Sequence, residues 1–309
     1  MPEPVALTLP VTPPFDFRLT LAFLSGFPPM QGEQATGGEL RKATRLDGQT
    51  VGLVVRAGAE GLDVTLHPER ALESAQVQAL RERITFFLAA DVNLNTFYGL
   101  GAKDEAFQPV LRELRGFHQP RFLTPFEAAC WAILTQRQPL AQARRMKRAL
   151  SDARGGEWEG HPAFPEPADL AGLGEDDFRA LIPNGRRARA LHAVTRAFQG
   201  VQTADLAAAP YGEVREWLLG LHGIGEWSAL FILLRGLGRI ERLHVNDPDS
   251  ADPDSAFLNE LLKAARPVYG DLTAPELWML ADRYGDQQGQ WAIHLRSRSA
   301  LIPGKEGAV

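Results

Sequence analysis

This chain has a single cysteine and no long apolar run, and its first residues do not have the pattern of a secretion signal. Cys130 is the one cysteine among 309 residues, so the chain forms no disulfide of its own and offers no cysteine-ligated iron–sulfur cluster or zinc site. No apolar run reaches the ~18 residues of a membrane-spanning helix. Segment 1–17 has no basic stretch followed by an apolar one, as a secretory signal has. We therefore expect a cytoplasmic protein of bacterial type with no membrane partner.

A surplus of positive charge is also missing, because the formal net charge is −5. Proteins that neutralise phosphates usually carry a basic surplus. The basic residues nevertheless gather in two groups, each of which taken alone is typical of a solvated helix face. Only their combination with the motif described below indicates a side that faces an anionic partner. The groups are Arg144, Arg145, Lys147 and Arg148, and Arg186, Arg187, Arg189 and Arg196.

Residues 1–105 have the pattern of a small antiparallel sheet with a helix on one face. Apolar residues recur every three or four positions over 74–89, which is the period of a helix. Leu62, Val64 and Leu66 alternate with polar residues, which is the period of a strand. We expect an α+β domain here, with further strands at Gly38–Arg45 and Val51–Arg56 joined by a turn at Asp47-Gly48.

Residues 106–309 have a helical pattern throughout and predict an all-α domain. Thr124 is a capping residue, Pro125 fits the first helical position, and Glu127 lies three after the cap, which is typical of a helix start. The stretch 153–173 is rich in Gly and Pro and predicts a loop. Further helices are expected at 139–152, 176–182, 186–199, 212–221, 226–237, 256–265, 274–284 and 288–299.

A glycine hairpin at Gly223-Ile224-Gly225 lies between two of these apolar helices, so a helix-hairpin-helix unit is expected at about 212–237. Backbone amides at a helix N-terminus bind an anion such as a phosphate without any basic side chain. Trp227 follows at once and offers a flat apolar face. Asp247 lies 24 residues after Gly223. A phosphate clamp, an aromatic plate and a carboxylate at these intervals indicate chemistry on a nucleotide.

The pattern Leu-x-Gly-Ile-Gly-x-Trp-Ser-Ala, followed by this Asp, resembles the helix-hairpin-helix DNA glycosylases. The best match is their 3-methyladenine DNA glycosylase II branch, the bacterial alkylation-repair enzymes. The resemblance covers nearly the whole chain and implies base excision repair of nucleoid DNA by a monomeric hydrolase. Other matching segments are Pro13–Phe17, Phe126–Gln136, Arg187–Leu191, Tyr284–Asp286 and Trp291-Ala292.

The resemblance implies a role for each matching residue, in an enzyme that excises alkylated purines, such as 3-methyladenine and 7-methylguanine, from duplex DNA after flipping them out. No cofactor is required, although the family binds a monovalent cation through hairpin carbonyls, here those of Leu219, Leu221 and Ile224. The base would stack on Trp227, Phe231 and Phe23. The DNA would be held by Gly223, Ile224, Gly225, Gln136 and Arg137, with Arg137 as the wedge in the gap.

The catalytic carboxylate stabilises the oxocarbenium-like sugar that the departing base leaves. Counting forward from the hairpin gives Asp247. A tandem repeat, 247–251 and 252–256, interrupts the register, and counting back from Phe257 gives Asp254 instead. Asp252, which precedes Pro253, would make a good helix cap. Asp247 is preferred, with Asp254 and Asp252 as alternates.

Two positions bear on specificity. Glycosylases that also cut the strand carry a Lys where this chain has Trp227, so a monofunctional enzyme that leaves an abasic site is expected. Arg296 stands where some members have a pocket Trp, and its charge would repel a cationic base. Two other interpretations stay open: a non-catalytic binder of damaged DNA on the same fold, and a helical interaction protein whose hairpin binds a partner other than DNA.

Overall fold

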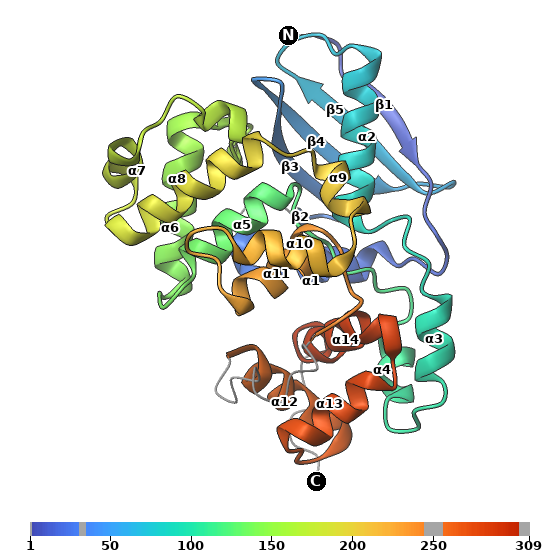
Figure 1. The fold of residues 1–309 in the computed structure, drawn as a ribbon. Helices are drawn as coiled ribbons and strands as arrows, with labels where there is room; N and C mark the ends of the chain where they lie inside the picture. The colour runs from blue at the N-terminus through green and yellow to red at the C-terminus, as the bar shows by residue number, and fades with distance from the viewer. Residues whose placement is uncertain (1, 31–34, 244–255, 303–309) are drawn as a thin grey trace.

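The computed structural model describes residues 2–30, 35–243 and 256–302. An antiparallel sheet forms in the N-terminal region and helices make up most of the rest, which confirms the predicted α+β class. The sheet and helix α2 (Ser74–Leu88) lie at one end of the molecule, and the C-terminal helices lie at the other (Figure 1). Helix α11 (Glu226–Gly236), which begins just after the glycine hairpin, lies between them.

The sheet has five antiparallel strands in the order β1-β5-β4-β3-β2. The predicted turn between β3 and β4 is confirmed, since Asp47 and Gly48 have φ angles of 49° and 70°, and Asn, Asp and Gly are the residues that tolerate such left-handed positions best. The strands are β1 (Val5–Leu9), β2 (Ala35–Thr36), β3 (Glu39–Leu46), β4 (Gln49–Ala57) and β5 (Leu62–Pro68).

A second, two-stranded sheet corrects the prediction for the Gly/Pro-rich stretch 153–173. Strands β6 (Gly156–Trp158) and β7 (His161–Ala163) form a hairpin within it that packs against β3 and β4. The contact depends on Gly52 in β4, because a Cβ there would lie 2.1 Å from the Trp158 ring. The hairpin therefore owes its place to a contact between distant parts of the sequence.

The predicted helices are confirmed to within a few residues at most ends, and the structure adds helices at 17–26, 95–101, 108–113 and 203–208. Before α5, the Thr124 hydroxyl accepts the Glu127 amide at 3.1 Å, as predicted, but the Glu127 carboxylate pairs with buried Lys147. The remaining helices are α1 (Phe17–Gly26), α3 (Asn95–Gly101), α4 (Gln108–Glu113), α5 (Pro125–Leu134), α6 (Leu140–Arg154), α7 (Glu175–Leu181), α8 (Gly185–Gln199), α9 (Thr203–Ala208), α10 (Tyr211–Leu219), α12 (Ala256–Tyr269), α13 (Ala274–Asp282) and α14 (Gln288–Leu301).

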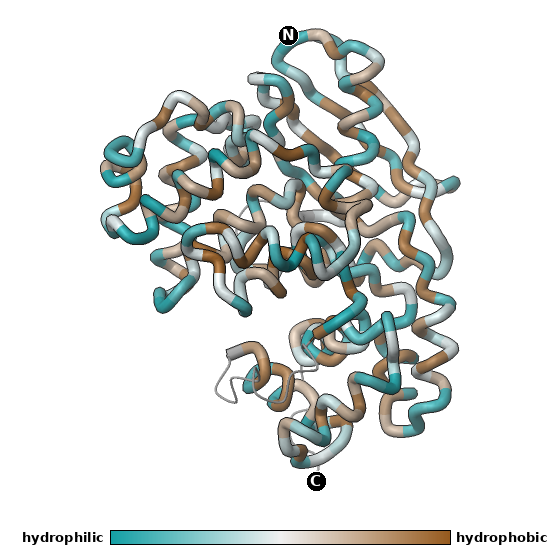
Figure 2. Tube along the Cα trace, viewed as in Figure 1, coloured by the Kyte–Doolittle hydropathy of each residue, from teal (hydrophilic) through white to brown (hydrophobic). Residues whose placement is uncertain are grey.

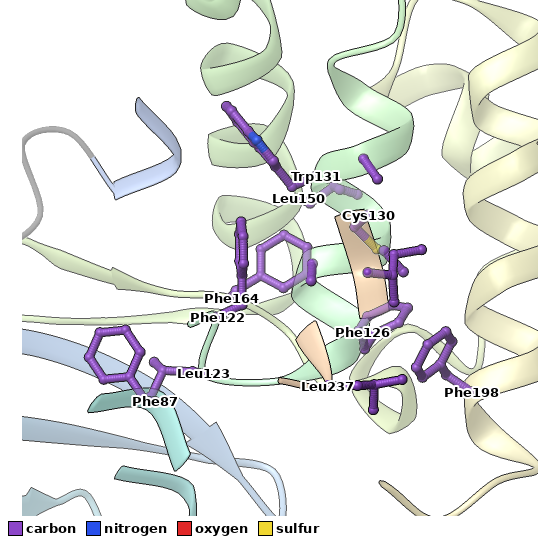
Figure 3. Packing of buried hydrophobic residues seen from close by; sticks show 14 of the residues in the cluster. Phe87, Phe122, Leu123, Phe126, Cys130, Trp131, Leu150, Phe164, Phe198 and Leu237 are labelled. Atoms are coloured by element: carbon purple, nitrogen blue, oxygen red, sulfur yellow. The ribbon is translucent and has the colours of Figure 1, made fainter. Parts of the chain in front are cut away.

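Two hydrophobic cores hold these elements. The first joins the sheet and α2 to α5, α6, α8 and α11, and the second joins α3 and α4 to α12, α13 and α14. Figure 3 shows the first core where α5 enters it, with Phe87 near Leu123 and Phe198 near Phe126. The predicted domain boundary at residue 105 falls between α3 and α4, which share the second core, so the division into 1–105 and 106–309 stays a prediction.

Apolar residues recur along the strands and helices in every part of the fold rather than gathering in one continuous stretch (Figure 2). Each amphipathic helix therefore buries one side, as α8 does with Ala188, Leu191 and Val194. No helix in the described ranges is both long and apolar enough to cross a membrane.

Candidate nucleic-acid interface

The hairpin between α10 and α11 is closed by a glycine that no other residue replaces easily. Gly223 has a φ of +89°, and a Cβ on it would lie 2.4 Å from the Cβ of Ala190 on α8. Ile224 is buried, and its amide donates to the carbonyl of Leu221 at 3.0 Å. The turn is thus fixed from inside by its own hydrogen bond and from outside by α8.

Two main-chain amides of the hairpin are left for an external acceptor. Neither Gly223 N–H nor Gly225 N–H makes a hydrogen bond within the described part of the chain. Gly225 is the N-cap of α11, and no side chain caps that helix end. A helix N-terminus carries a partial positive charge and orphan donors, so the turn offers what a phosphate needs. The predicted phosphate-binding role of these residues stays a prediction.

The hairpin carbonyls fit the predicted cation in their chemistry. Leu219 O and Ile224 O accept no hydrogen bond from any described residue, while Leu221 O accepts only that of Ile224. Three main-chain oxygens with spare lone pairs suit a hard monovalent cation. Among the described residues, no cluster of His, Cys, Asp and Glu is placed to hold a metal ion instead.

The aromatic residues predicted to bind the base belong to one chain of ring contacts. Trp227 and Phe231, one turn apart on α11, stack with centroids 5.4 Å apart and planes 17° apart. Phe231 packs edge-on against Phe122 at 5.7 Å, and Phe122 against Phe27 at 5.6 Å. Phe27 stacks on Phe23 at 5.3 Å, which brings the α1 residue into the same group.

Arg235 completes this aromatic group and had no counterpart in the sequence prediction. It follows Phe231 by one further turn of α11, and its guanidinium carbon lies 4.5 Å from the Phe27 ring centre and 5.2 Å from that of Phe23. Burial, together with repulsion from Arg296 and Arg121, lowers the pKa of Arg235 to about 9. Its Nε and Nη2 atoms have no hydrogen-bond partner in the part of the chain that the structure describes, where ring contacts hold the side chain.

The aromatic group lies at the seam between the two cores. Phe23 and Trp227 are half-buried and pack against both of them. Ligand sites often form where two packed units meet. This position gives the Trp227 ring both a rigid support and an accessible edge.

The loop between α5 and α6, residues 135–139, carries the predicted wedge Arg137 and is called the wedge loop below. Side-chain hydrogen bonds tie it to the hairpin. Gln136 donates from Nε2 to the carbonyl of Gly223 at 2.7 Å and to the hydroxyl of buried Ser228 at 3.2 Å. Arg137, next in the chain, is exposed and has a φ of +49°. The structure therefore brings Gln136 to the hairpin and leaves the Arg137 side chain on the surface beside it.

The candidate catalytic carboxylates, those of Asp247, Asp252 and Asp254, lie in 244–255, outside the described residues. Phe257, which supports the count back to Asp254, is buried on α12. Arg296 forms an ion pair with Glu260, which offsets part of its charge, although Arg296 still repels the guanidinium of Arg235.

The two basic groups are only partly solvated, which corrects their interpretation as helix faces. Lys147 is buried and pairs with Glu127 at 2.9 Å. Arg187 is also buried, on the side of α8 that faces the wedge loop. Arg145 and Arg186 are exposed, as predicted.

Comparison with known proteins gives the fold a name. No protein-family model matches the chain. A DNA-3-methyladenine glycosylase of Bacillus subtilis is 24% identical over 178 residues, 56% of this chain and 59% of that protein. The chain thus spans about three fifths of the length of this curated relative.

A 3-methyladenine DNA-glycosylase from Archaeoglobus fulgidus has a TM-score of 0.71 at 19% identity, with 97% of this chain and 99% of that one covered. The chain has the fold of the helix-hairpin-helix DNA glycosylases.

The predicted resemblance is therefore confirmed as a similarity in sequence to a DNA-3-methyladenine glycosylase and as a shared fold. Proteins that share this fold are named for more than one substrate, however. An 8-oxoguanine glycosylase/lyase of Clostridium acetobutylicum, solved in complex with duplex DNA, has a TM-score of 0.61 at 16% identity, with 92% of this chain and 91% of that one covered. Substrate and reaction must be argued from the residues of the site.

Proposed function

We propose that this protein is a monofunctional DNA N-glycosylase that removes alkylated purines from duplex DNA and leaves an abasic site. The observation that carries the proposal is the glycine hairpin with two free amides directly beside the stacked pair Trp227 and Phe231. One part suits a DNA phosphate and the other suits a flat base. Both are attached to the same helix, α11, so a nucleotide held by the hairpin is held at a fixed distance from the rings.

Binding begins at the backbone of the DNA. The amides of Gly223 and Gly225 donate to one phosphate and anchor the strand next to the lesion. A monovalent cation on the carbonyls of Leu219, Leu221 and Ile224 would add positive charge at that phosphate. Arg137 fills the gap that the extruded nucleotide leaves, where its planar guanidinium stacks on the neighbouring bases.

The extruded purine stacks against Trp227, with Phe231 and Phe23 as further apolar walls. Many alkylated purines are cationic, and an electron-rich indole attracts a cation by about 0.5–2 kcal/mol beyond stacking. The ion pair of Arg296 with Glu260 reduces the repulsion that an unpaired arginine would cause. A cationic base is also a good leaving group, so the reaction needs no general acid.

The glycosidic bond breaks with the electron pair leaving on the base and positive charge growing on the sugar. The carboxylate of Asp247 stabilises that charge, orients the water that adds to C1′ and accepts the proton that this water loses. Trp227 has no amine to form a Schiff base with the sugar, so the strand stays intact. The products are a free purine and an abasic site.

The test is release of free base from methylated duplex DNA, with parallel assays of binding to an abasic analogue. We expect the parent protein to release 3-methyladenine or 7-methylguanine, and Asp247→Asn to lose release by about 100-fold or more while it still binds the analogue. Asp254→Asn serves as the matched control at the other end of the repeat. Release that survives in Asp247→Asn and is lost in Asp254→Asn would move the catalytic role to Asp254.

A second candidate function comes from the tandem repeat at 247–256, which lengthens the segment that carries the carboxylates. Such a protein would bind damaged DNA on the same fold without cutting the base free. Tight binding of the abasic analogue by the parent, with no release from any methylated substrate, would favour this function. Duplex affinity that does not change with salt would instead favour a partner other than DNA.

A further inference from the structure

Arg187 on α8 is a buried cation that has no acidic partner. The residue is 9% exposed, and no carboxylate of the described residues pairs with it. No described residue forms a hydrogen bond with its Nε atom, and burial lowers the pKa of its guanidinium. Its backbone is fixed at the start of α8, where the Arg187 amide donates to the side chain of the N-cap Asn184 at 3.0 Å. A guanidinium kept in such a place calls for an explanation beyond the packing of α8.

The guanidinium of Arg187 contacts two residues of the wedge loop. Arg187 Nη2 donates to the main-chain carbonyl of Gln136. The side-chain amide of Gln138 lies against the same guanidinium, with its oxygen 3.2 Å and 3.3 Å from the two η nitrogens in the orientation that pairs them. One planar group thus holds the residues on both sides of Arg137.

Gln136 carries the connection on to the hairpin. Its main chain accepts from Arg187, while its side chain donates to the carbonyl of Gly223 and to the hydroxyl of Ser228. Helix α8 also touches the hairpin directly, at the close approach of Ala190 to Gly223. Three segments far apart in the sequence, the α5–α6 loop, α8 and the hairpin, are therefore joined at one point.

The backbone at Arg137 explains why the loop must be held from both sides. Its φ of +49° is a left-handed conformation that a residue with a Cβ adopts only when its surroundings impose it. The bonds of Arg187 to the two flanking residues hold the backbone on either side of it. The exposed side chain of Arg137 then leaves the surface in one direction, next to the amides that would bind the phosphate.

We propose that Arg187 is a positioning residue that locks the wedge loop onto the hairpin, so that insertion of Arg137 and the grip on the phosphate occur as one rigid unit. The inference rests on the proposed function for the identity of the DNA-facing elements. Arg187 itself is buried and touches neither base nor sugar in this arrangement. Its loss would let Arg137 move while the hairpin amides stay in place, which separates base extrusion from backbone binding.

The experiment compares Arg187→Met with Arg186→Met, which removes the same charge from an exposed neighbour on the same helix. Duplexes carrying 2-aminopurine beside an abasic analogue report unstacking by fluorescence, and anisotropy reports affinity. At saturating protein, we expect Arg187→Met to lose most of the fluorescence rise and Arg186→Met to keep it. Base release under single turnover should fall tenfold to about a hundredfold in Arg187→Met, and Arg187→Lys, which keeps one donor for Gln136, should recover part of it.

Release from methylated single strands provides a readout that a merely structural role would not separate. Without a duplex to open, Arg187→Met should release base at a rate close to that of the parent. An equal loss on single and double strands, or equal fluorescence in Arg187→Met and the parent, would overturn the proposal. If the methionine variant does not fold, Arg187→Lys carries the same comparison. If the parent releases no base, the proposed function fails, but the fluorescence comparison still decides the role of Arg187.

Discussion

At the scale of single residues, this protein buries several ionisable side chains away from water. His294 on α14 is fully buried in contact with the rings of Phe97 and Phe117, and its Nε2 atom has no hydrogen-bond partner among the described residues. Arg235 and Arg187 are buried, and no carboxylate in the described part of the chain pairs with either of them. Such groups cost stability, so their presence marks positions where geometry matters more than folding free energy.

His294 gives a prediction about acid stability. Burial lowers its pKa to about 3, with His118 adding repulsion, against about 6.5 in an unfolded chain. Between these values only the unfolded state binds the proton, so the free energy of unfolding falls as the pH drops below 6.5, by at most about 1.4 kcal/mol per pH unit. The pKa of His118 is lowered by burial too and acts in the same direction.

The check is urea unfolding at pH 7, 6 and 5 for the parent and for His294→Leu. The variant lacks one of the two buried imidazoles, so its stability should fall less steeply with acid. Parallel curves for the two proteins would show that His294 is not the titrating group.

At the scale of elements, the hairpin and α8 pack closely against each other. Gly223 lies against Ala190 with no room for a Cβ. Gly225, two residues on, has a φ of −107°, and beyond its chain neighbours no atom lies within 4 Å of the place that a Cβ would take. The two glycines of one motif therefore do different things. The first lets the backbone turn and approach α8, and the second leaves the helix end open to a ligand.

Alanine substitutions separate these two roles. We expect Gly223→Ala to lower the free energy of unfolding by about 2 kcal/mol or more, because it adds both a strained φ and a clash. Gly225→Ala should change it by less than about 0.5 kcal/mol. Thermal unfolding of both variants measures the difference, and equal losses would mean that the contact with α8 does not limit the turn.

The elements that sequence patterns predict best here are the long periodic ones. Helices α2, α6, α8 and α14 have enough turns for apolar spacing to show, and Asp47-Gly48 is itself a turn signal. The β6–β7 hairpin and the short helices are not predicted, because they depend on contacts such as that of Trp158 with Gly52. The local sequence pattern cannot predict a contact with a residue about a hundred positions away.

The residues of the candidate site also divide into those that the local sequence predicts and those that depend on distant contacts. Trp227, Phe231 and Gly223 belong to one contiguous motif, so the sequence predicts them together. Phe122, Arg235 and Arg187 join the site through hydrogen bonds and ring contacts with other elements, and each has the sequence pattern of an ordinary core or surface residue. A periodic aromatic–aromatic–arginine spacing along α11 is the one signal that could have pointed to Arg235.

At the scale of the whole molecule, two cores meet at the aromatic group, since Phe23 and Trp227 pack against both, and the hairpin ends two residues before Trp227. The net charge of −5 tells little about this side, because the hairpin binds an anion through main-chain amides rather than through basic side chains. The proposed chemistry therefore depends on one spatial relation. A carboxylate from segment 247–254 must come next to the sugar of a nucleotide whose phosphate the hairpin holds.

A crystal structure with duplex DNA that contains a pyrrolidine abasic analogue tests this relation most directly. We predict a phosphate on the amides of Gly223 and Gly225, Arg137 in the gap of the duplex, and a carboxylate of Asp247 or Asp254 in hydrogen-bond contact with the ring nitrogen that stands in for the charged sugar. A complex in which the DNA reaches the hairpin but every aspartate of the repeat lies away from that nitrogen would contradict it.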